Sequence, residues 1–443
     1  MNNFNDDLTK GSIYSHLIKL AIPASMGMMF DTLYNLTDNW YAGMISDTAL
    51  VGLSLAGIVF ILLISLTIGL QSGTSAIVAP DFAKNNNNKV NAWIANSLSI
   101  GLAMSVLILV LGLLFSENLL NLLSDDKAAK KQGWDYLFII LLGNSAYAIS
   151  SICAGALIAM GNTKIYRNIL VIGFFANIIL NPILTFQLNL GIRGLALATL
   201  LIKIASAIYL FRSLHKYTHV YIWPQFDWLT IKSSLKQIIP ASLNFLTIII
   251  GAFFIVAFVG RFGSEAVAGY SVALRIEQVL LLPALGLSSA VMAIVGQNYG
   301  VNNIHRVHET YSKSLKLGLL VSVVFIPVMI FAGPLLIGFF TDNKQMIEVG
   351  QLYLQADAAA FYAYVMIFTC VSVLQAIKQP IFPLIIGVSR QLILPVGVNY
   401  ILIVQLGYPI TALFWSVVLI VIVSAFVMMW YSQKQIKLLI NKN

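Results

Sequence analysis

Long apolar segments recur along the whole chain and are separated by short polar connections. A membrane-spanning helix needs about 20 consecutive, mostly apolar residues, and the chain offers twelve such segments. The segments are continuously apolar, whereas the strands of a membrane β-barrel alternate over about ten residues. The expected helical spans are 15–42, 50–80, 92–115, 135–159, 168–188, 193–212, 238–260, 266–297, 315–340, 352–376, 380–404 and 409–431.

The composition agrees with a membrane protein. Of the 443 residues, 59% are hydrophobic and only 10% are charged, whereas a soluble protein carries about 25% charged residues. So few charges cannot cover a surface that faces water. We therefore expect an all-α integral membrane protein that acts as a monomer in the lipid bilayer.

The positive charges are unevenly placed. If the N-terminus is cytoplasmic, the inner connections and ends carry seventeen Lys and Arg residues and the outer connections carry six. This asymmetry follows the positive-inside rule. It predicts a multi-pass protein of a bacterial cytoplasmic (inner) membrane with both termini in the cytoplasm. It also explains the net charge of +9 without nucleic acid as a partner.

The two halves of the chain are similar to each other. The tetrapeptide IPAS occurs at residues 22–25 and again at residues 239–242, an offset of 217. The same offset, without gaps, aligns further identical residues, among them Gly69 with Gly286, Tyr136 with Tyr353 and Cys153 with Cys370. We expect both cysteines to be buried free thiols, because each lies within a predicted span.

The repeat predicts two lobes of six helices each. The expected domains are 1–220 and 221–443, joined by a polar cytoplasmic linker at about 212–237. Because each half has an even number of spans, both halves have the same orientation and are related by an axis along the membrane normal. Two such lobes can rock between inward-open and outward-open states, so this organisation favours a transporter.

Several segments resemble one family of transporters in their order and spacing. They are IPASMGMMFDTLYNLTDNWYAG, GLQSGTSAIVAPDFAKNNNNKV, GALIAMGNTK, NIILNPILTF and ALRIEQVLLLPALGL. Together they are similar to the multidrug and toxic compound extrusion (MATE) family. The resemblance implies two bundles of six helices, no cofactor, and export of organic cations and amphipathic drugs in exchange for H⁺ or Na⁺.

Carboxylates inside the spans are the candidate functional groups. Of seventeen Asp and Glu residues, only Asp31, Asp38 and Glu277 lie well inside predicted spans. A charged group there costs at least ~2.5 kcal/mol on insertion scales, so it usually faces a cavity and has a function. In the first span, helical spacing places four polar positions on one face, namely Asp31, Tyr34, Asn35 and Asp38.

The family resemblance assigns the central role to Asp38. It implies that Asp38 binds the coupling ion, H⁺ or Na⁺, with oxygen and amide groups of later helices, which here are Asn177, Asn181 and Thr199. The expected substrate cavity is lined by Asp31, Tyr34, Asn35 and Tyr136. The structural alternative is that Asp38 only fastens two helices by bonding Asn177.

The chain departs from the family at three positions. Several close relatives carry a second Asp where this chain has Asn181. The family more usually has a neutral polar residue where this chain has Asp31, and the NorM-like branch carries an Asp about where Tyr364 stands. The counterpart of Asp38 in the second half is Ile255. The resemblance therefore places coupling in the first half, as in DinF-like members.

A second polar group is expected in the other half. It comprises Arg275, Glu277, Asp357 and Arg390. Arg275 and Glu277 are two residues apart, so they point to different sides of a helix. We interpret the group as a structural ion network, with a substrate role as the alternative.

Two other functions were compared with drug export. A flippase for lipid or lipid-linked substrates has a similar two-lobed plan, but a cavity for pyrophosphate is basic, whereas the first span here is acidic. An enzyme is disfavoured because the sequence contains no HExxH, GxSxG or P-loop motif. The five histidines all lie in segments expected to be cytoplasmic.

Overall fold

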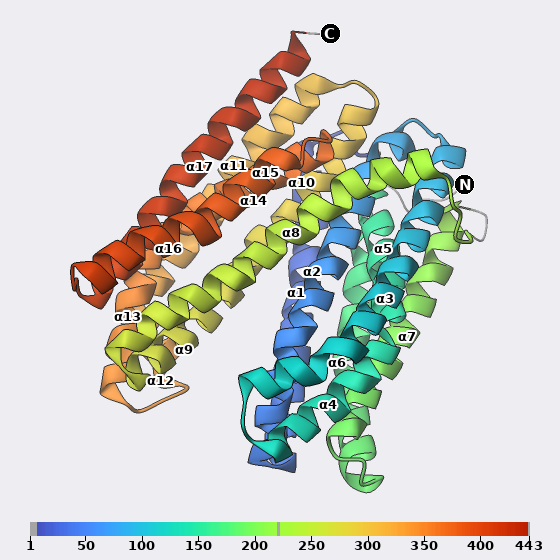
Figure 1. The fold of residues 1–443 in the computed structure, drawn as a ribbon. Helices are drawn as coiled ribbons and strands as arrows, with labels where there is room; N and C mark the ends of the chain where they lie inside the picture. The colour runs from blue at the N-terminus through green and yellow to red at the C-terminus, as the bar shows by residue number, and fades with distance from the viewer. Residues whose placement is uncertain (1–6, 219–221, 442–443) are drawn as a thin grey trace. The chain divides into compact units, whose positions relative to one another are not determined.

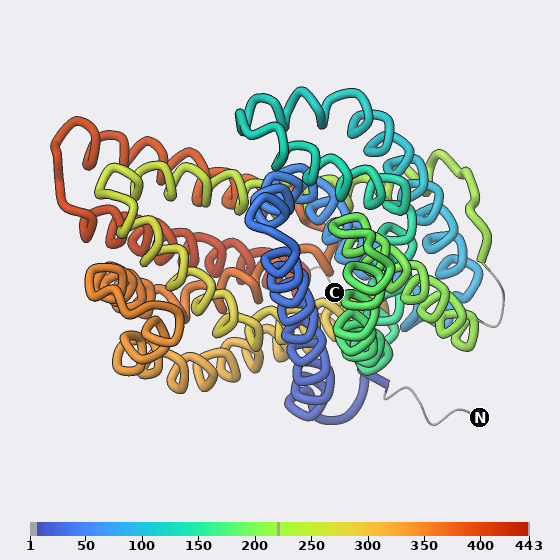
Figure 2. Tube along the Cα trace, turned by 90° about the horizontal axis from the view of Figure 1, so that it is seen from below, coloured from blue at the N-terminus to red at the C-terminus, as the bar shows by residue number. Residues whose placement is uncertain are grey.

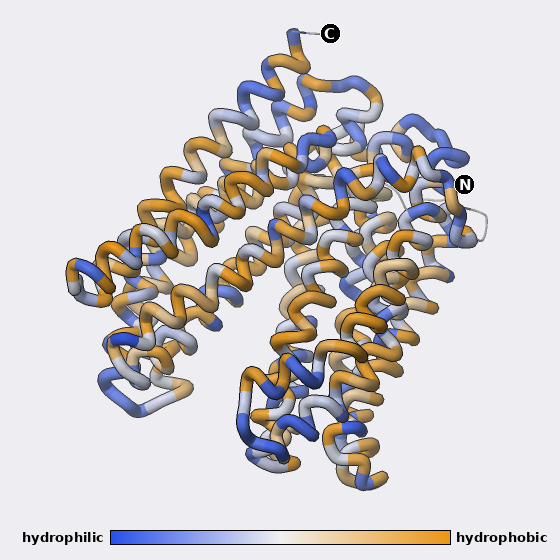
Figure 3. The backbone as a smooth tube through the Cα atoms, viewed as in Figure 1, coloured by the Kyte–Doolittle hydropathy of each residue, from blue (hydrophilic) through white to orange (hydrophobic). Residues whose placement is uncertain are grey.

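The computed structural model describes residues 7–218 and 222–441, and these residues are helical nearly throughout (Figure 1). Within them, eight helical segments are each long and apolar enough to cross a membrane. Hydrophobic residues extend along these helices, and hydrophilic residues gather toward their ends (Figure 3). The eight segments are α2 (Asp47–Ala83), α3 (Asn87–Leu123), α6 and η1 (Thr163–Gln187), α7 (Ile192–Thr218), α8 and η2 (Trp228–Phe262), α11 (Ile304–Phe331), α15 through η4 (Ile381–Gln405) and α17 (Ile410–Ile440).

Three further predicted spans are broken helices. The sequence pattern predicts them as continuous, but each bends at a short break. The breaks lie between α4 (Lys127–Leu142) and α5 (Asn144–Ala159), between α9 (Ser264–Leu280) and α10 (Leu282–Gly300), and between α13 (Lys344–Ala358) and α14 (Phe361–Ala376), with bends of 53°, 40° and 54°.

Local sequence explains two of these breaks. Gly143 ends α4 and precedes α5, and a Cβ added there would lie 1.9 Å from Leu200 Cδ1 of α7, so only glycine lets α7 approach the break this closely. Pro283 lies in the first turn of α10, where its missing N–H costs nothing, whereas it would disrupt a continuous helix. A hydropathy profile averages over such positions and does not detect them.

The remaining predicted span, 15–42, is the helix α1 (Ile13–Ile45), which is 33 residues long. Among the described residues, α1 is not counted with the helices that are apolar enough to cross a membrane. Its second half carries Asp31, Asn35, Asp38 and Asn39, which lower its hydropathy. The twelve predicted spans thus each have a helical counterpart, and the least apolar one carries the candidate coupling residue.

The described residues form two units that differ from a division at residue 220. Unit 1 comprises Met26–Ser242, and unit 2 comprises residues 7–25 with residues 243–441. The first turns of α1 therefore belong to unit 2, and the first turns of α8 belong to unit 1. Each half of the chain contributes the beginning of its leading helix to the unit that the other half builds.

Glycines make room for these exchanged helix starts. In unit 1, a Cβ added at Gly69 of α2 would lie 1.8 Å from Ser242 Oγ of α8. In unit 2, a Cβ added at Gly286 of α10 would lie 2.0 Å from Ser25 Oγ of α1. The offset of 217 relates Gly69 to Gly286 and Ser25 to Ser242. The repeated IPAS segments and glycines thus mark equivalent helix contacts, one in each unit.

Within unit 1, α2 packs against α3, α4 and α5, and α7 packs against α5 and α6 (Figures 1 and 2). Within unit 2, α10 packs against α11 and α14, and α13 packs against α9. Cys153 and Cys370 are buried free thiols, which confirms the sequence prediction. The short elements α12 (Gly333–Gly338), η3 (Ser389–Ile393) and α16 (Leu394–Asn399) complete unit 2.

Candidate functional site

Asp38 lies at the centre of a buried polar cluster in unit 1. Its side chain comes from α1 and is only 6% exposed. Asn177 and Asn181 of α6 lie one helical turn apart and are both 0% exposed, and Thr199 of α7 is 3% exposed. Two consecutive helices, α6 and α7, and the distant α1 therefore converge on one carboxylate.

Hydrogen bonds join these four residues. Asn177 Nδ2 and Asn181 Nδ2 donate to Asp38 Oδ1 at 2.7 and 2.9 Å. Thr199 Oγ1 donates to Asp38 Oδ2 at 3.2 Å, and Asn181 Nδ2 also donates to Asn177 Oδ1 at 3.1 Å. Both oxygens of the carboxylate thus accept from uncharged donors, an arrangement that stabilises the charge of the ionised form.

One buried acceptor in this cluster has no partner. The side-chain oxygen of Asn181 is buried and accepts no hydrogen bond. A buried polar atom without a partner is costly and calls for an explanation. This oxygen could accept from a protonated Asp38 or serve as a ligand for Na⁺, which prefers oxygen. The residues present could therefore hold either a proton or a sodium ion.

Tyrosines surround the carboxylate. Tyr34 of α1, Tyr136 of α4 and Tyr147 of α5 are all less than 8% exposed and are close enough to interact electrostatically with Asp38. The hydroxyl groups of Tyr34 and Tyr147 are buried without a hydrogen-bond partner. The sequence predicts Tyr34 and Tyr136 at this site but not Tyr147, although the offset of 217 pairs Tyr147 with Tyr364.

Asp31 and Asn35 do not join the hydrogen-bonded cluster around Asp38. Asn35 is exposed, and its side chain donates to the backbone oxygen of Asp31 at 2.8 Å. Asp31 Oδ1 lies 3.8 Å from Lys203 Nζ of α7. The Lys203 ammonium also lies over the rings of Tyr34 and Tyr147, at 5.8 and 5.3 Å from their centroids. The charge of Asp31 is thus partly compensated.

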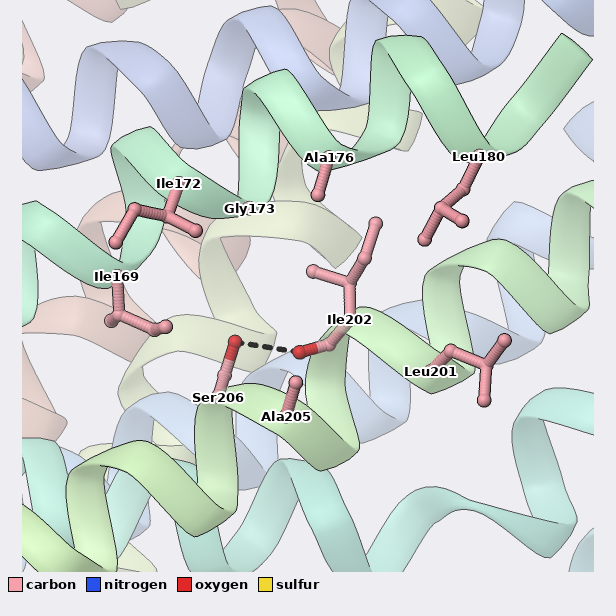
Figure 4. Close-up of a pocket in the computed structure, with 9 residues that line it drawn as sticks. All are labelled: Ile169, Ile172, Gly173, Ala176, Leu180, Leu201, Ile202, Ala205 and Ser206. Atoms are coloured by element: carbon pink, nitrogen blue, oxygen red, sulfur yellow. Dashed lines mark hydrogen bonds between the residues drawn. The ribbon is translucent and has the colours of Figure 1, made fainter.

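An apolar recess of about 270 Å³ lies between α6 and α7 (Figure 4). Its one side-chain hydroxyl, on Ser206, donates to the backbone oxygen of Ile202 at 2.7 Å. It therefore offers no charge to a cation. It is lined by Ile169, Ile172, Gly173, Ala176, Leu180, Leu201, Ile202, Ala205 and Ser206.

In unit 2 the structure buries Glu277, Asp357 and Arg390 but leaves Arg275 exposed. Arg275 therefore does not join the other three. Among the described residues, no group of three or more His, Cys, Asp or Glu residues could hold a metal ion.

Known proteins share both the sequence pattern and the fold. The MatE family model matches residues 23–183 and 240–401. The chain is 26% identical over 390 residues to an FAD transporter of Shewanella oneidensis, covering 85% of each chain. It is 22% identical over 431 residues to the multidrug export protein MepA of Staphylococcus aureus, covering 93% of this chain and 91% of MepA.

The fold is similar to that of solved transporters. A structure of a MOP superfamily transporter from Pyrococcus furiosus superposes with a TM-score of 0.92 at 22% identity, covering 99% of both chains. A MATE structure in the straight conformation superposes with a TM-score of 0.91 at 23% identity.

Proposed function

The chain belongs to the MatE family of transporters, and we propose that it exports organic cations and amphipathic drugs in exchange for H⁺ or Na⁺, with Asp38 as the coupling group. The observation that carries the proposal is the buried Asp38 carboxylate, which accepts hydrogen bonds from Asn177, Asn181 and Thr199. A lone carboxylate held by neutral donors can exist charged or neutralised without rebuilding the helices around it.

The proposed exchange works because the single negative charge of Asp38 binds the drug and the coupling ion in turn. Ionised Asp38 attracts a cationic drug. Neutralisation of Asp38, by a proton or by Na⁺ bound among the oxygens of Asp38 and Asn181, removes that attraction and favours drug release. Release of the coupling ion on the cytoplasmic side restores the charge. Coupling is strict only if drug and ion never hold the carboxylate together.

Exchange of one coupling ion for one monovalent cation moves no net charge. The membrane potential, worth about 2.3 kcal/mol per charge per 100 mV, then contributes nothing. The gradient of the coupling ion supplies the drive. Dissipating the pH gradient and the Na⁺ gradient separately, in inverted vesicles that accumulate ethidium, identifies the ion.

Asp38→Asn is the direct test. We expect the variant to fold but to lose ethidium accumulation driven by an ion gradient. The matched control is Asp125→Asn, since Asp125 is an exposed carboxylate outside the cluster. Ethidium accumulation by Asp38→Asn at the wild-type rate would show that coupling does not use this carboxylate and would favour a purely structural role.

The membrane orientation is part of the proposal. We place the chain in a bacterial inner membrane with both termini in the cytoplasm. The support is the excess of Lys and Arg on the connections that share the side of the N-terminus. Accessibility of single cysteines at Lys10 and Lys437 to an impermeant maleimide, in whole cells and in inverted vesicles, tests this orientation.

An anionic or zwitterionic amphiphile is a second candidate substrate class. It is favoured by Lys203, whose ammonium lies in the tyrosine cluster near Asp38, and by the similarity to a transporter named for FAD. Competition of FAD with ethidium for uptake into vesicles distinguishes the two classes.

A further inference from the structure

Unit 2 buries two carboxylates and one guanidinium group in segments that span the membrane. Glu277 of α9 is 5% exposed, Asp357 of α13 is 2% exposed, and Arg390 of the π-helical segment η3 is 6% exposed. A charged group at such a place costs about 2.5–3.5 kcal/mol on insertion scales, so charges kept there are usually paired or neutralised. The proposed coupling at Asp38 uses none of these three residues.

Each carboxylate is held by a tyrosine. Tyr353, from the same helix as Asp357, donates its hydroxyl hydrogen to Glu277 Oε2. Tyr364 of α14 donates to Asp357 Oδ1 at 3.1 Å. The other oxygen of Asp357, Oδ2, is buried and has no hydrogen-bond partner. An ionised carboxylate with a bare, buried oxygen is strongly destabilised, and a proton on that carboxylate removes the charge.

Arg390 does not neutralise both acids by contact. Among the described residues, the structure contains no ion pair within 4.0 Å between Arg390 and either carboxylate. Its Nε is buried without a partner. Its terminal nitrogens donate to the side-chain oxygen of Gln391, at 2.8 and 2.6 Å, once that amide is oriented with its oxygen toward them. Arg390 nevertheless interacts electrostatically with Glu277.

The charges of the three groups add to −1 if all are ionised. Glu277 and Asp357 repel each other, and two carboxylates that share a site do not both ionise readily. The other titratable groups that face them are Tyr270, Tyr353 and Tyr364, which are neutral donors. One proton on the acid pair would make the whole buried group neutral.

The repeat supports a site of this kind in unit 2. Tyr353 and Tyr364 are the counterparts of Tyr136 and Tyr147 at the offset of 217. In unit 1 that tyrosine pair lies beside the carboxylate of Asp38. Both units therefore use equivalent tyrosines next to buried acid groups, although the acids come from different helices.

We propose that Glu277 and Asp357 form a second proton-binding site in unit 2, where the two carboxylates share one exchangeable proton and Arg390 balances the remaining negative charge. The ligand is a proton, and the site is separate from Asp38. The proton binds to a carboxylate oxygen of the pair and leaves from it to water when the site opens to solvent.

Infrared difference spectroscopy of the purified full-length protein, titrated with pH, tests the proposal. Protonated carboxyl groups give a resolved C=O stretching signal. We expect Asp38→Asn to retain a titrating carboxyl signal, and we expect Glu277→Gln and Asp357→Asn each to abolish that same signal. Either single variant leaves one carboxylate and the Arg390 guanidinium, whose charges add to zero, so the buried group needs no proton to be neutral.

Three other results would overturn the proposal of a shared proton. The signal could persist in both variants, which would show that the pair holds no exchangeable proton. Each variant could instead remove a different signal, which would show two independent protons. Addition of NaCl at constant pH should leave the signal unchanged. Its loss on Na⁺ addition would assign the site to a metal cation and overturn the proposal.

Tyr353→Phe keeps the test decisive if the acid variants do not fold. It retains both carboxylates and removes only the donor to Glu277. We expect the carboxyl signal to remain and to shift in frequency. The control is Tyr362→Phe, because the Tyr362 hydroxyl donates to a backbone oxygen and not to a carboxylate. This control should leave the frequency of the signal unchanged. An unshifted signal in Tyr353→Phe would overturn the assignment. Ethidium export by Asp38→Asn is a separate readout, so failure of one proposal leaves the other testable.

Discussion

The ammonium group of Lys203 lies 3.8 Å from the carboxylate of Asp31. The same ammonium is 5.3 Å from the centroid of the Tyr147 ring, within the range of a cation–π contact. A positive charge of the protein itself thus occupies aromatic faces near Asp38. Under the proposed function, a cationic drug is attracted by the charge of Asp38 and competes with the Lys203 ammonium for these aromatic faces.

Lys203→Gln should therefore strengthen the binding of a monovalent cationic dye. Removal of the resident charge frees the aromatic faces and leaves Asp31 unpaired, and we expect the Kd for ethidium to fall about threefold to tenfold. Fluorescence polarisation of the purified protein measures this change. FAD binding should weaken in the same variant if the site accepts anions.

Lys203→Arg is the control, because it retains the positive charge and should leave the ethidium Kd near the wild-type value. A Kd that rises in Lys203→Gln would show that Lys203 organises the site rather than competing with the drug. Asp31→Asn should change stability by less than about 1 kcal/mol, since its ion pair with Lys203 is long at 3.8 Å and partly open to solvent.

Thr199→Val tests the hydrogen bond to Asp38 Oδ2. Valine has nearly the same shape but no hydroxyl, so the variant should lose about 1 kcal/mol of stability and export ethidium more slowly. Thr185→Val is a matched control, because the Thr185 hydroxyl is buried in unit 1 without a hydrogen-bond partner. That control should be neutral or stabilising in thermal unfolding. Equal effects of the two substitutions would argue against a specific role for the Thr199 hydroxyl.

Gly69→Ala should disrupt the contact between α2 and the first turns of α8. The added Cβ would lie 1.8 Å from Ser242 Oγ and 2.8 Å from the backbone oxygen of Ile238. We expect a loss of about 1–3 kcal/mol, as for other overpacked contacts, seen as a lower midpoint of thermal unfolding in detergent.

Gly57→Ala provides the comparison on the same helix. A Cβ at Gly57 meets nothing within 4 Å, and alanine is up to about 1 kcal/mol better than glycine in a helix. This variant should be as stable as the wild type or more so. A Gly69→Ala protein that is as stable as Gly57→Ala would mean that α8 does not approach α2 so closely.

Arg306 fastens the segment before α1 to unit 2. Its terminal nitrogens donate to the backbone oxygens of Leu8, Lys10 and Gly11 at 3.3, 3.2 and 3.0 Å. Arg306→Lys retains the charge but cannot reach three carbonyls in this geometry. We expect trypsin to cleave after Lys10 about fivefold to tenfold faster, as for a local opening that becomes ~1–1.4 kcal/mol easier, measured by mass spectrometry.

Lys316→Arg is the matched exchange on the same helix, where residue 316 is exposed. It should leave the cleavage rate after Lys10 unchanged. A rate that stays at the wild-type value in Arg306→Lys would contradict an anchoring role for the guanidinium group.

The sequence by itself determined the helical spans, the repeat and the principal residues of the candidate site. Membrane spans are local features, because each must contain its own run of apolar residues and satisfy its own backbone hydrogen bonds. The offset of 217 is visible wherever both halves keep the same residue. Asp38 stands out because a carboxylate in an apolar helix is rare and costly, and the family pattern added Asn177, Asn181 and Thr199.

Only the tertiary structure decided which side chains meet. Asp31 and Lys203 are 172 positions apart, and no local pattern records their pairing. Similarly, Asn35 and Asp38 share a helix, yet one is exposed and the other buried, because only packing against α6 and α7 distinguishes their directions. Packing between helices also decides that the starts of α1 and α8 are exchanged between the two units. Hydropathy specifies that a helix is buried in the membrane, whereas close contacts between small residues such as Gly69 and Ser242 decide which helix it lies against.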